Sequence, residues 1–184
     1  MEIRLTQYSH GAGCGCKISP AILDTMLHSE IVAANFPQLL VGNASKDDAA
    51  VYDLGDGTCI VSTTDFFMPI VDDPRTFGSI ASVNAISDIY AMGISRVDHM
   101  LMVLGVSLMM NKQEREIITR EMIRGFNDCA NEAGTLITGG QSIMNPWPII
   151  GGVANKCFRT IYLPLKALSG HRYLKKCFLF HHFK

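Results

Sequence analysis

Residues 48–67, "DAAVYDLGDGTCIVSTTDFF", decide the fold of this chain. Two runs rich in β-branched and aromatic residues lie on either side of Gly55-Asp56-Gly57, and a glycine-rich bend between such runs is typical of a β-hairpin. The stretch therefore predicts a strand, a turn and a second strand, and it places Asp65 where the second strand ends.

Helices and further strands are predicted on both sides of this hairpin. Asp73-Pro74 is an N-cap followed by a proline at the first helical position, so a helix should cover 75–92 and stop at Gly93. Apolar residues recur every four positions over 112–132, which predicts a second long helix. Ser19-Pro20 predicts a shorter helix over 20–28. Apolar runs predict strands at 38–42, 97–108, 135–138 and 147–154.

The composition is that of a globular protein. The 184 residues are 48% hydrophobic and 18% charged, which fits one folded domain rather than a disordered chain. No apolar run is long enough to span a membrane, and the first residues lack the plan of a signal peptide. The six cysteines are therefore expected to be reduced thiols, in a soluble cytoplasmic protein without a nucleic-acid or membrane partner.

The charges are unevenly distributed along the chain. All 17 acidic residues lie at or before Glu132, and residues 157–184 are basic, with three of the six histidines. One interpretation is a basic functional tail. The other is an end that was not selected to fit the preceding domain, such as an altered coding end.

Four aspartates are the most informative polar residues. Asp47 and Asp48 directly precede a predicted strand, Asp65 ends the next one, and Asp88 lies within the first long helix. Carboxylates at strand ends and on one helix face can converge on a hard cation such as Mg²⁺, which prefers oxygen ligands and keeps phosphate oxygens in its shell. The alternative is that these residues only cap turns and helices.

The segment "ITGGQS", residues 137–142, follows a predicted strand with two glycines and small polar groups. Glycine allows backbone N–H groups to approach a phosphate closely. No lysine follows, so the segment is not a phosphate-binding loop of the Walker type. A simple turn explains it equally well.

Cys14, Cys16 and Lys17 lie together in the glycine-rich leader "GAGCGCKISP", residues 11–20. The two thiols fit half of a metal site, although no second closely spaced pair follows. They also fit a redox dithiol, or a nucleophilic or carrier thiol whose pKa is lowered by the lysine. Two incidental loop cysteines are the remaining alternative.

Six segments lie in a fixed order between about Arg4 and Ala154: "LTQYSHGAGCGCKISP", "LLVGNASKDDAAVYDLGDGT", "STTDFFMPIVDDP", "NAISDIYAMG", "LITGGQS" and "NPWPIIGGVA". Together they closely resemble the selenophosphate synthetase (selenide, water dikinase) family. The resemblance implies an ATP-dependent reaction that converts selenide, ATP and water to selenophosphate, AMP and orthophosphate, and so supplies the selenium donor for selenocysteine synthesis.

The resemblance also implies roles for individual residues. Cys14 matches the family's catalytic cysteine, and Lys17 matches its essential lysine, which contacts the nucleotide phosphate. Cys16 matches a second cysteine of less fixed role. Asp48 and Asp88 match Mg²⁺ ligands. The remaining nucleotide-contacting positions are Ser45, Lys46, Asp47, Asp65, Asp88, Gly140, Gln141 and Ser142.

The fold implied is the α+β N-terminal domain of aminoimidazole ribonucleotide synthetase-like proteins, a mixed sheet with helices on one face. Two such sheets join into a β-barrel across a dimer. We expect a mobile catalytic leader at 1–19 that adds little to the core, an ATP-binding domain at 20–156 and an unrelated basic tail at 157–184. The family's second domain, which carries a further Mg²⁺-ligating aspartate, has no counterpart after Ala154.

Three functions follow from these observations. The first is selenophosphate synthesis. The second is a truncated, inactive form that binds nucleotide and forms a dimer with the full-length enzyme or regulates it; on this view the 184-residue chain turns over little ATP. The third is a thiol or metal-binding module that uses Cys14 and Cys16.

Overall fold

The computed structural model describes residues 4–9, 11, 13–30 and 36–159, so most of the expected tail lies outside the described residues. The strands are β1 Leu39–Val41, β2 Ala50–Asp53, β3 Thr58–Phe67, β4 His99–Ser107, β5 Ile137–Asn145 and β6 Ile149–Arg159. The helices are α1 Pro20–Glu30, α2 Pro74–Ala91 and α3 Lys112–Glu132, with short 3₁₀ turns η1 Leu5–Tyr8, η2 Gly13–Cys16 and η3 Asn43–Ser45.

The strands form one sheet in the order β1-β2-β3-β6-β4-β5. The predicted hairpin is confirmed as β2 and β3, which pair antiparallel from Asp53↔Cys59 to Ala50↔Ser62. Strand β5 runs parallel to β4, whereas the other pairs are antiparallel. The sheet is therefore mixed, as expected. Among the described strands the sheet is open, with β1 and β5 at its edges, so these strands do not close a barrel within one chain.

The two long helices begin where the sequence predicts. The Asp73 side chain accepts a hydrogen bond from the backbone N–H of Thr76 at 2.7 Å, and α2 starts at Pro74. Asn111 and Glu114 form a reciprocal capping box at the start of α3. Both caps satisfy backbone N–H groups that lack partners within the helix.

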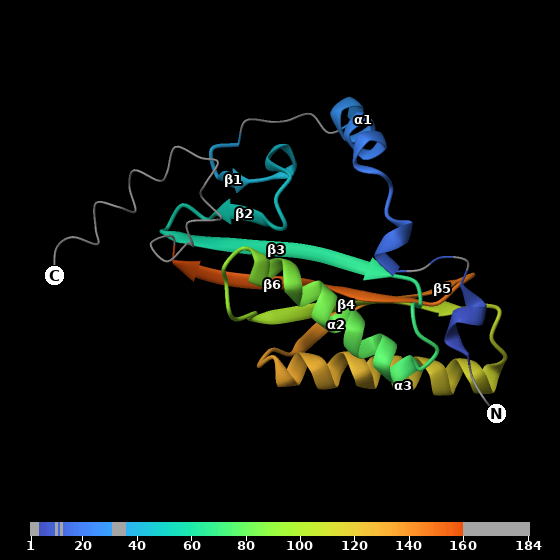
Figure 1. The fold of residues 1–184 in the computed structure, drawn as a ribbon. Helices are drawn as coiled ribbons and strands as arrows, with labels where there is room; N and C mark the ends of the chain where they lie inside the picture. Colours follow the sequence, from blue (N-terminus) through green and yellow to red (C-terminus); the bar gives the residue numbers. More distant parts are fainter. Residues whose placement is uncertain (1–3, 10, 12, 31–35, 160–184) are drawn as a thin grey trace.

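Helices α2 and α3 form a second layer against the sheet (Figure 1). Helix α2 packs on β3 and β6, and α3 packs against α2 and reaches β4. The two helices approach closely at Gly78 and Gly125, where a Cβ atom would meet backbone atoms of the other helix. Phe77 and Phe126 are fully buried in the core between these layers.

Helix α1 does not join this layer, contrary to the expectation that all three helices share one face. Its apolar residues Ile22, Leu23 and Met26 are 53%, 40% and 51% exposed. Among the described elements, none packs extensively against α1. An ion pair between Asp24 and Lys46 connects it to the turn before β2.

The first part of the leader is held in place, so the expectation of a leader that adds little to the core is wrong for residues 4–9. Leu5 is 0% exposed and Tyr8 is 9% exposed, and both belong to the core. The Leu5 N–H donates to the carbonyl of Asp72 at 3.1 Å. A single buried leucine among polar neighbours leaves no periodic signal, which is why the sequence did not reveal this contact.

Three strand boundaries also differ from the predictions. Strand β3 continues to Phe67, so Asp65 lies within it rather than at its end. The segment "ITGGQS" belongs to β5 and is not a turn. Strand β6 extends to Arg159, three residues beyond the expected domain boundary, because 157–159 pair with the start of β3.

No helix of the described part of the chain is long and apolar enough to cross a membrane.

Candidate functional site

An ion pair between the leader and the central strand β3 lies at the centre of the candidate site. The Lys17 ammonium donates to Oδ2 of Asp65 at 2.9 Å. Asp65 is 8% exposed, because the odd-numbered residues of β3 face α2, while the Lys17 side chain is 59% exposed. The leader thus brings a cation from the surface to a nearly buried carboxylate.

Asp88 lies in the last turn of α2 and faces the same part of β3. Its Oδ2 accepts a hydrogen bond from the Thr63 hydroxyl at 2.8 Å. Thr63 precedes Asp65 by two positions, so both side chains are on the same face of the strand. A negative charge at the C-terminal end of a helix is disfavoured by the helix dipole, so this position suits a carboxylate that binds a cation.

Burial raises the pKa of Asp88 above its ordinary value, and the hydrogen bond from Thr63 opposes this shift. The negative charges of Asp65 and Asp48 raise the pKa further, and the positive charge of Lys17 lowers it. Lys17, Asp48, Asp65 and Asp88 therefore form one electrostatic group. We call these four residues the acidic cluster.

The acidic cluster offers oxygen ligands of the kind that Mg²⁺ prefers. Mg²⁺ is commonly bound by one or two carboxylates, with water and phosphate oxygens completing its shell. No three His, Cys, Asp or Glu side chains are close enough to hold a metal ion by themselves, as far as the structure describes the chain. The arrangement thus fits a metal that arrives with a phosphate ligand, and not a metal site complete in the protein alone.

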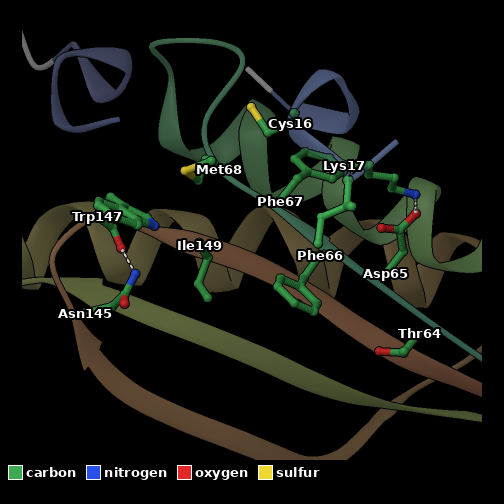
Figure 2. A pocket seen from close by; sticks show the side chains of 12 residues that line it. Cys16, Lys17, Thr64, Asp65, Phe66, Phe67, Met68, Asn145, Trp147 and Ile149 are labelled. Atoms are coloured by element: carbon green, nitrogen blue, oxygen red, sulfur yellow. Dashed lines mark hydrogen bonds and ion pairs between the residues drawn. The ribbon is translucent and has the colours of Figure 1, made fainter. Parts of the chain in front are cut away.

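A pocket of about 460 Å³ adjoins the ion pair. Figure 2 shows Lys17 and Asp65 at one side of it and the rings of Phe66 and Trp147 along its wall. Cys16 from the leader also lines it. The pocket is therefore bounded by the leader, by the end of β3 and by the turn between β5 and β6.

The turn that carries Trp147 is fixed by hydrogen bonds. The side-chain amide of Asn145 donates to the Trp147 carbonyl at 2.7 Å (Figure 2). The buried hydroxyl of Ser107, at the end of β4, donates to the Pro146 carbonyl at 2.7 Å. The pocket wall is consequently preformed on this side.

Other predicted nucleotide-contacting residues lie elsewhere or have local roles. The Ser45 hydroxyl donates to the Gly42 carbonyl at 2.7 Å and closes the η3 turn. Lys46 forms its ion pair with Asp24, and Asp47 accepts from the N–H of Asp48.

Gly140, Gln141 and Ser142 are exposed on the edge strand β5. Strands β6 and β4 lie between β5 and β3, which corresponds to about 14 Å at the usual strand spacing. Gly140 has a φ of 147°, and a Cβ atom there would lie 1.9 Å from the Met102 carbonyl oxygen. The fold itself thus requires this glycine.

Sequence reasoning did not single out Thr63, Phe66 or Trp147. The period-2 alternation of "STTDFF" could have placed Thr63 on the same face as Asp65. No comparable signal exists for Phe66 and Trp147, which line the same pocket only because β3 pairs with β6. Cys14 lies within η2, next to the pocket-lining Gly13.

Comparison with known proteins places this chain among related sequences. The family model "AIR synthase related protein, N-terminal domain" matches residues 46–155. Proteins named selenide, water dikinase are 58% identical in Photorhabdus laumondii and 57% identical in Escherichia coli K12, over 150 residues. Each match covers 82% of this chain and 42% of the relative, so the chain spans less than half the length of these relatives.

The fold likeness extends to more distant proteins. A solved structure described as AaThiL complexed with AMPPCP and TMP superposes with a TM-score of 0.59 at 15% identity, over 75% of this chain and 41% of that one. At this identity the likeness concerns the fold alone. Because the family model spans more than half of the residues, the chain belongs to the AIR synthase related proteins, through their N-terminal domain.

Proposed function

We propose that this chain provides the nucleotide site of a cytoplasmic enzyme that makes selenophosphate from selenide and ATP, releasing AMP and orthophosphate. The observation that carries the proposal is the acidic cluster, in which the Lys17–Asp65 ion pair lines a pocket and both of these residues, together with Asp48, act electrostatically on Asp88. The sequence identity of 57–58% to proteins named selenide, water dikinase supports selenide as the substrate. The nucleotide analogue in the AaThiL complex is consistent with ATP.

The charges of the cluster suit phosphoryl transfer. Asp48 and Asp88 would hold Mg²⁺, which neutralises phosphate charge when bound. The Lys17 ammonium would contact a phosphate oxygen, and Asp65 orients this ammonium in the absence of nucleotide. The Thr63 hydroxyl fixes one oxygen of Asp88, which leaves the other oxygen for a cation.

The leader supplies the group that handles selenium. Cys14 lies within η2, three residues before Lys17, so both residues belong to the same short leader segment. The sulfur of a thiol is soft and polarisable, and its S–H would donate to the soft selenide anion and hold it beside the phosphate, with no S–Se bond formed. Leader residues that already line the pocket would exclude water, which would otherwise compete with selenide for the phosphoryl group.

A second copy of the chain is the partner that we propose. The sheet face opposite α2 carries apolar side chains that neither of the two long helices covers. Strand register places on this face Ile60, Phe66, Leu101, Val103, Ile143 and Val153. Phe66 and Ile143 are each 52% exposed. A dimer through this open face would bury the patch and bring the β5 edge, with Gly140–Ser142, to a second chain.

Magnesium-dependent nucleotide binding tests the proposal. The affinity of Asp48→Asn and Asp88→Asn for a non-hydrolysable ATP analogue should fall in Mg²⁺, because an amide cannot replace the charge of a carboxylate toward a divalent ion. The difference in affinity between each variant and the parent should disappear in EDTA, which removes Mg²⁺. Asp128→Asn is the matched control, since its exposed carboxylate pairs with Arg75 at the other end of α2. If both site variants bind Mg-nucleotide as the parent does, the aspartates are only caps.

Product analysis separates the competing functions. Selenide-dependent AMP release supports the synthetase. Mg-nucleotide binding and dimer formation without AMP release support the alternative of a regulatory partner. Metal uptake that requires Cys14 and Cys16 but neither Asp48 nor Asp88 would support a thiol module instead.

A further inference from the structure

The loop that follows β3 makes unusually close contacts with the glycines of the leader. Gly13 is buried, has a φ of 53°, and a Cβ atom placed on it would lie 2.5 Å from Cγ2 of Ile70. A β-branched side chain such as isoleucine has little freedom to move aside. Only glycine fits this position, both for its backbone conformation and for the space available.

A second contact of the same kind lies two residues earlier. A Cβ atom at Gly11 would meet Cε of Met68 at 2.2 Å and Sγ of Cys16 at 2.6 Å. Met68 and Cys16 both line the pocket and are drawn in Figure 2. The leader therefore rests on residues 68–70 through two positions that have no side chain. We call residues 68–70 the leader platform.

From these contacts we propose that the leader platform positions the catalytic segment 14–17 before any ligand binds. Gly13 is the positioning residue, because it rests against Ile70 directly before Cys14. The Lys17–Asp65 ion pair fixes the other end of the segment on β3. The proposal rests on the proposed function, since it assigns the platform a task in placing Cys14 and Lys17.

The platform explains why a glycine-rich leader can carry a precise site. An unanchored leader would lose conformational entropy each time it closed over a nucleotide, and this cost would weaken binding. A leader already in place at Leu5 and Gly13 has lost most of that freedom on folding. The glycines of this segment thus permit close packing, rather than the free hinge motion expected from the sequence.

Limited proteolysis of the intact chain tests the proposal. Trypsin requires a flexible segment around Lys17, so on this proposal cleavage after Lys17 should follow the undocked population when opening is fast. Gly13→Ala places a Cβ atom against Ile70 and forces an alanine into the left-handed backbone conformation. Both effects disfavour the docked segment, so cleavage should be about 5- to 30-fold faster. Gly15→Ala is the matched control, because it lies in the same η2 turn with nothing within 4 Å of its Cβ position. This variant should be cleaved at the parental rate.

A double variant distinguishes positioning from a general loss of structure. Ile70→Ala removes the atom that a new Cβ would strike, so Gly13→Ala/Ile70→Ala should be cleaved more slowly than Gly13→Ala alone. Such rescue is non-additive, as expected for residues in direct contact. Gly11→Ala should have a smaller effect than Gly13→Ala, because the end of Met68 is flexible.

The proposal is overturned if Gly13→Ala and Gly15→Ala are cleaved at equal rates, or if the Ile70 substitution gives no rescue. Thermal unfolding of each variant shows whether the domain remains folded. Neither readout uses nucleotide or selenide. The proteolysis result can therefore contradict the platform proposal while Mg²⁺-dependent nucleotide binding supports the proposed function. Conversely, nucleotide binding can contradict the proposed function while the rescue supports the platform.

Discussion

The Lys17 ammonium lies 2.9 Å from the Asp65 carboxylate, although 48 residues separate them along the chain. With the lysine side chain 59% exposed and the aspartate side chain 10% exposed, water screens only one end of the pair. Exposed ion pairs contribute about 0–1 kcal/mol to stability, so this pair is better suited to positioning than to holding the fold. Its value lies in keeping a cation beside the carboxylates where phosphate would bind.

Lys17→Ala should weaken nucleotide binding without unfolding the protein. Hydrogen bonds to charged groups contribute about 1.5–3 kcal/mol, which corresponds to roughly 10- to 100-fold in affinity. Equilibrium dialysis with a non-hydrolysable ATP analogue in Mg²⁺ measures this loss. Lys112→Ala, at the exposed start of α3, serves as the control. Equal affinity of both variants would remove Lys17 from the nucleotide site.

The parts of the fold that follow local rules could be predicted from the sequence. The cap at Asp73 and the bend at Gly55–Gly57 depend on residues within a few positions of one another, and both are confirmed. The capping box at Asn111, which was not predicted, is equally short-range. Such features are read from short-range patterns because their hydrogen bonds are short-range.

The parts that depend on distant partners could not be predicted. The two glycines of "ITGGQS" resemble a turn, yet pairing with β4 keeps them in a strand. The apolar stripe of α1 predicts burial that the described fold does not provide. The aspartates of the acidic cluster predicted a cation site from their places in the sequence, with turn and helix caps as the alternative, whereas Lys17 was assigned to the phosphate only through the family resemblance. Convergence of Asp65 and Asp88 requires α2 to pack on β3, and no local pattern encodes that contact.

The raised pKa of Asp88 predicts that its charge costs stability in the metal-free protein. The folded state binds a proton on the Asp88 carboxyl more tightly than the unfolded chain does. At neutral pH the carboxyl is ionised in both states, so the full cost of the buried charge is present there. It disappears as the pH falls through the raised pKa toward the ordinary value of about 4. Asp88→Asn keeps an oxygen acceptor for Thr63 but carries no charge.

In EDTA at pH 7, Asp88→Asn should therefore unfold at a higher urea concentration than the parent. The difference in urea midpoint between Asp88→Asn and the parent should shrink as the pH is lowered to about 4. Asp128→Asn is the matched control, since its carboxylate is exposed and lies away from the acidic cluster. A variant less stable than the parent at pH 7 would contradict the assignment of burial as the dominant cause.

Leu5→Ala should destabilise the domain even though it lies in the leader. The side chain is 0% exposed within the core, and truncating a buried leucine typically costs about 2–5 kcal/mol of unfolding free energy. Urea titration measures the loss. Ile22→Ala, which truncates a 53% exposed residue of α1, should change stability little. Equal effects of the two substitutions would mean that Leu5 is not anchored in solution.

The open face of the sheet should mediate self-association. Ile143 is exposed on β5, and Ile143→Lys places a charge where a second copy would bury it. Sedimentation at micromolar concentration should show a dimer for the parent and a monomer for this variant. Val83→Lys, at a position 56% exposed on α2, should remain dimeric. A monomeric parent would remove the dimer from the proposal.

The two leader thiols should differ in their importance for selenophosphate formation. Cys14 follows the positioning residue Gly13 directly, whereas Cys16 lines the pocket beside Lys17. The test is a chimera that joins this chain to the remaining length of the Escherichia coli relative, with selenide-dependent AMP release as the measurement. Cys14→Ser should abolish the reaction, because a serine hydroxyl stays protonated near neutral pH and is a much poorer nucleophile than a thiolate. Cys16→Ser should retain most of it, because one thiol is sufficient for a carrier. Loss of activity in Cys16→Ser with activity retained in Cys14→Ser would exchange the two roles and place the reactive sulfur in the pocket wall.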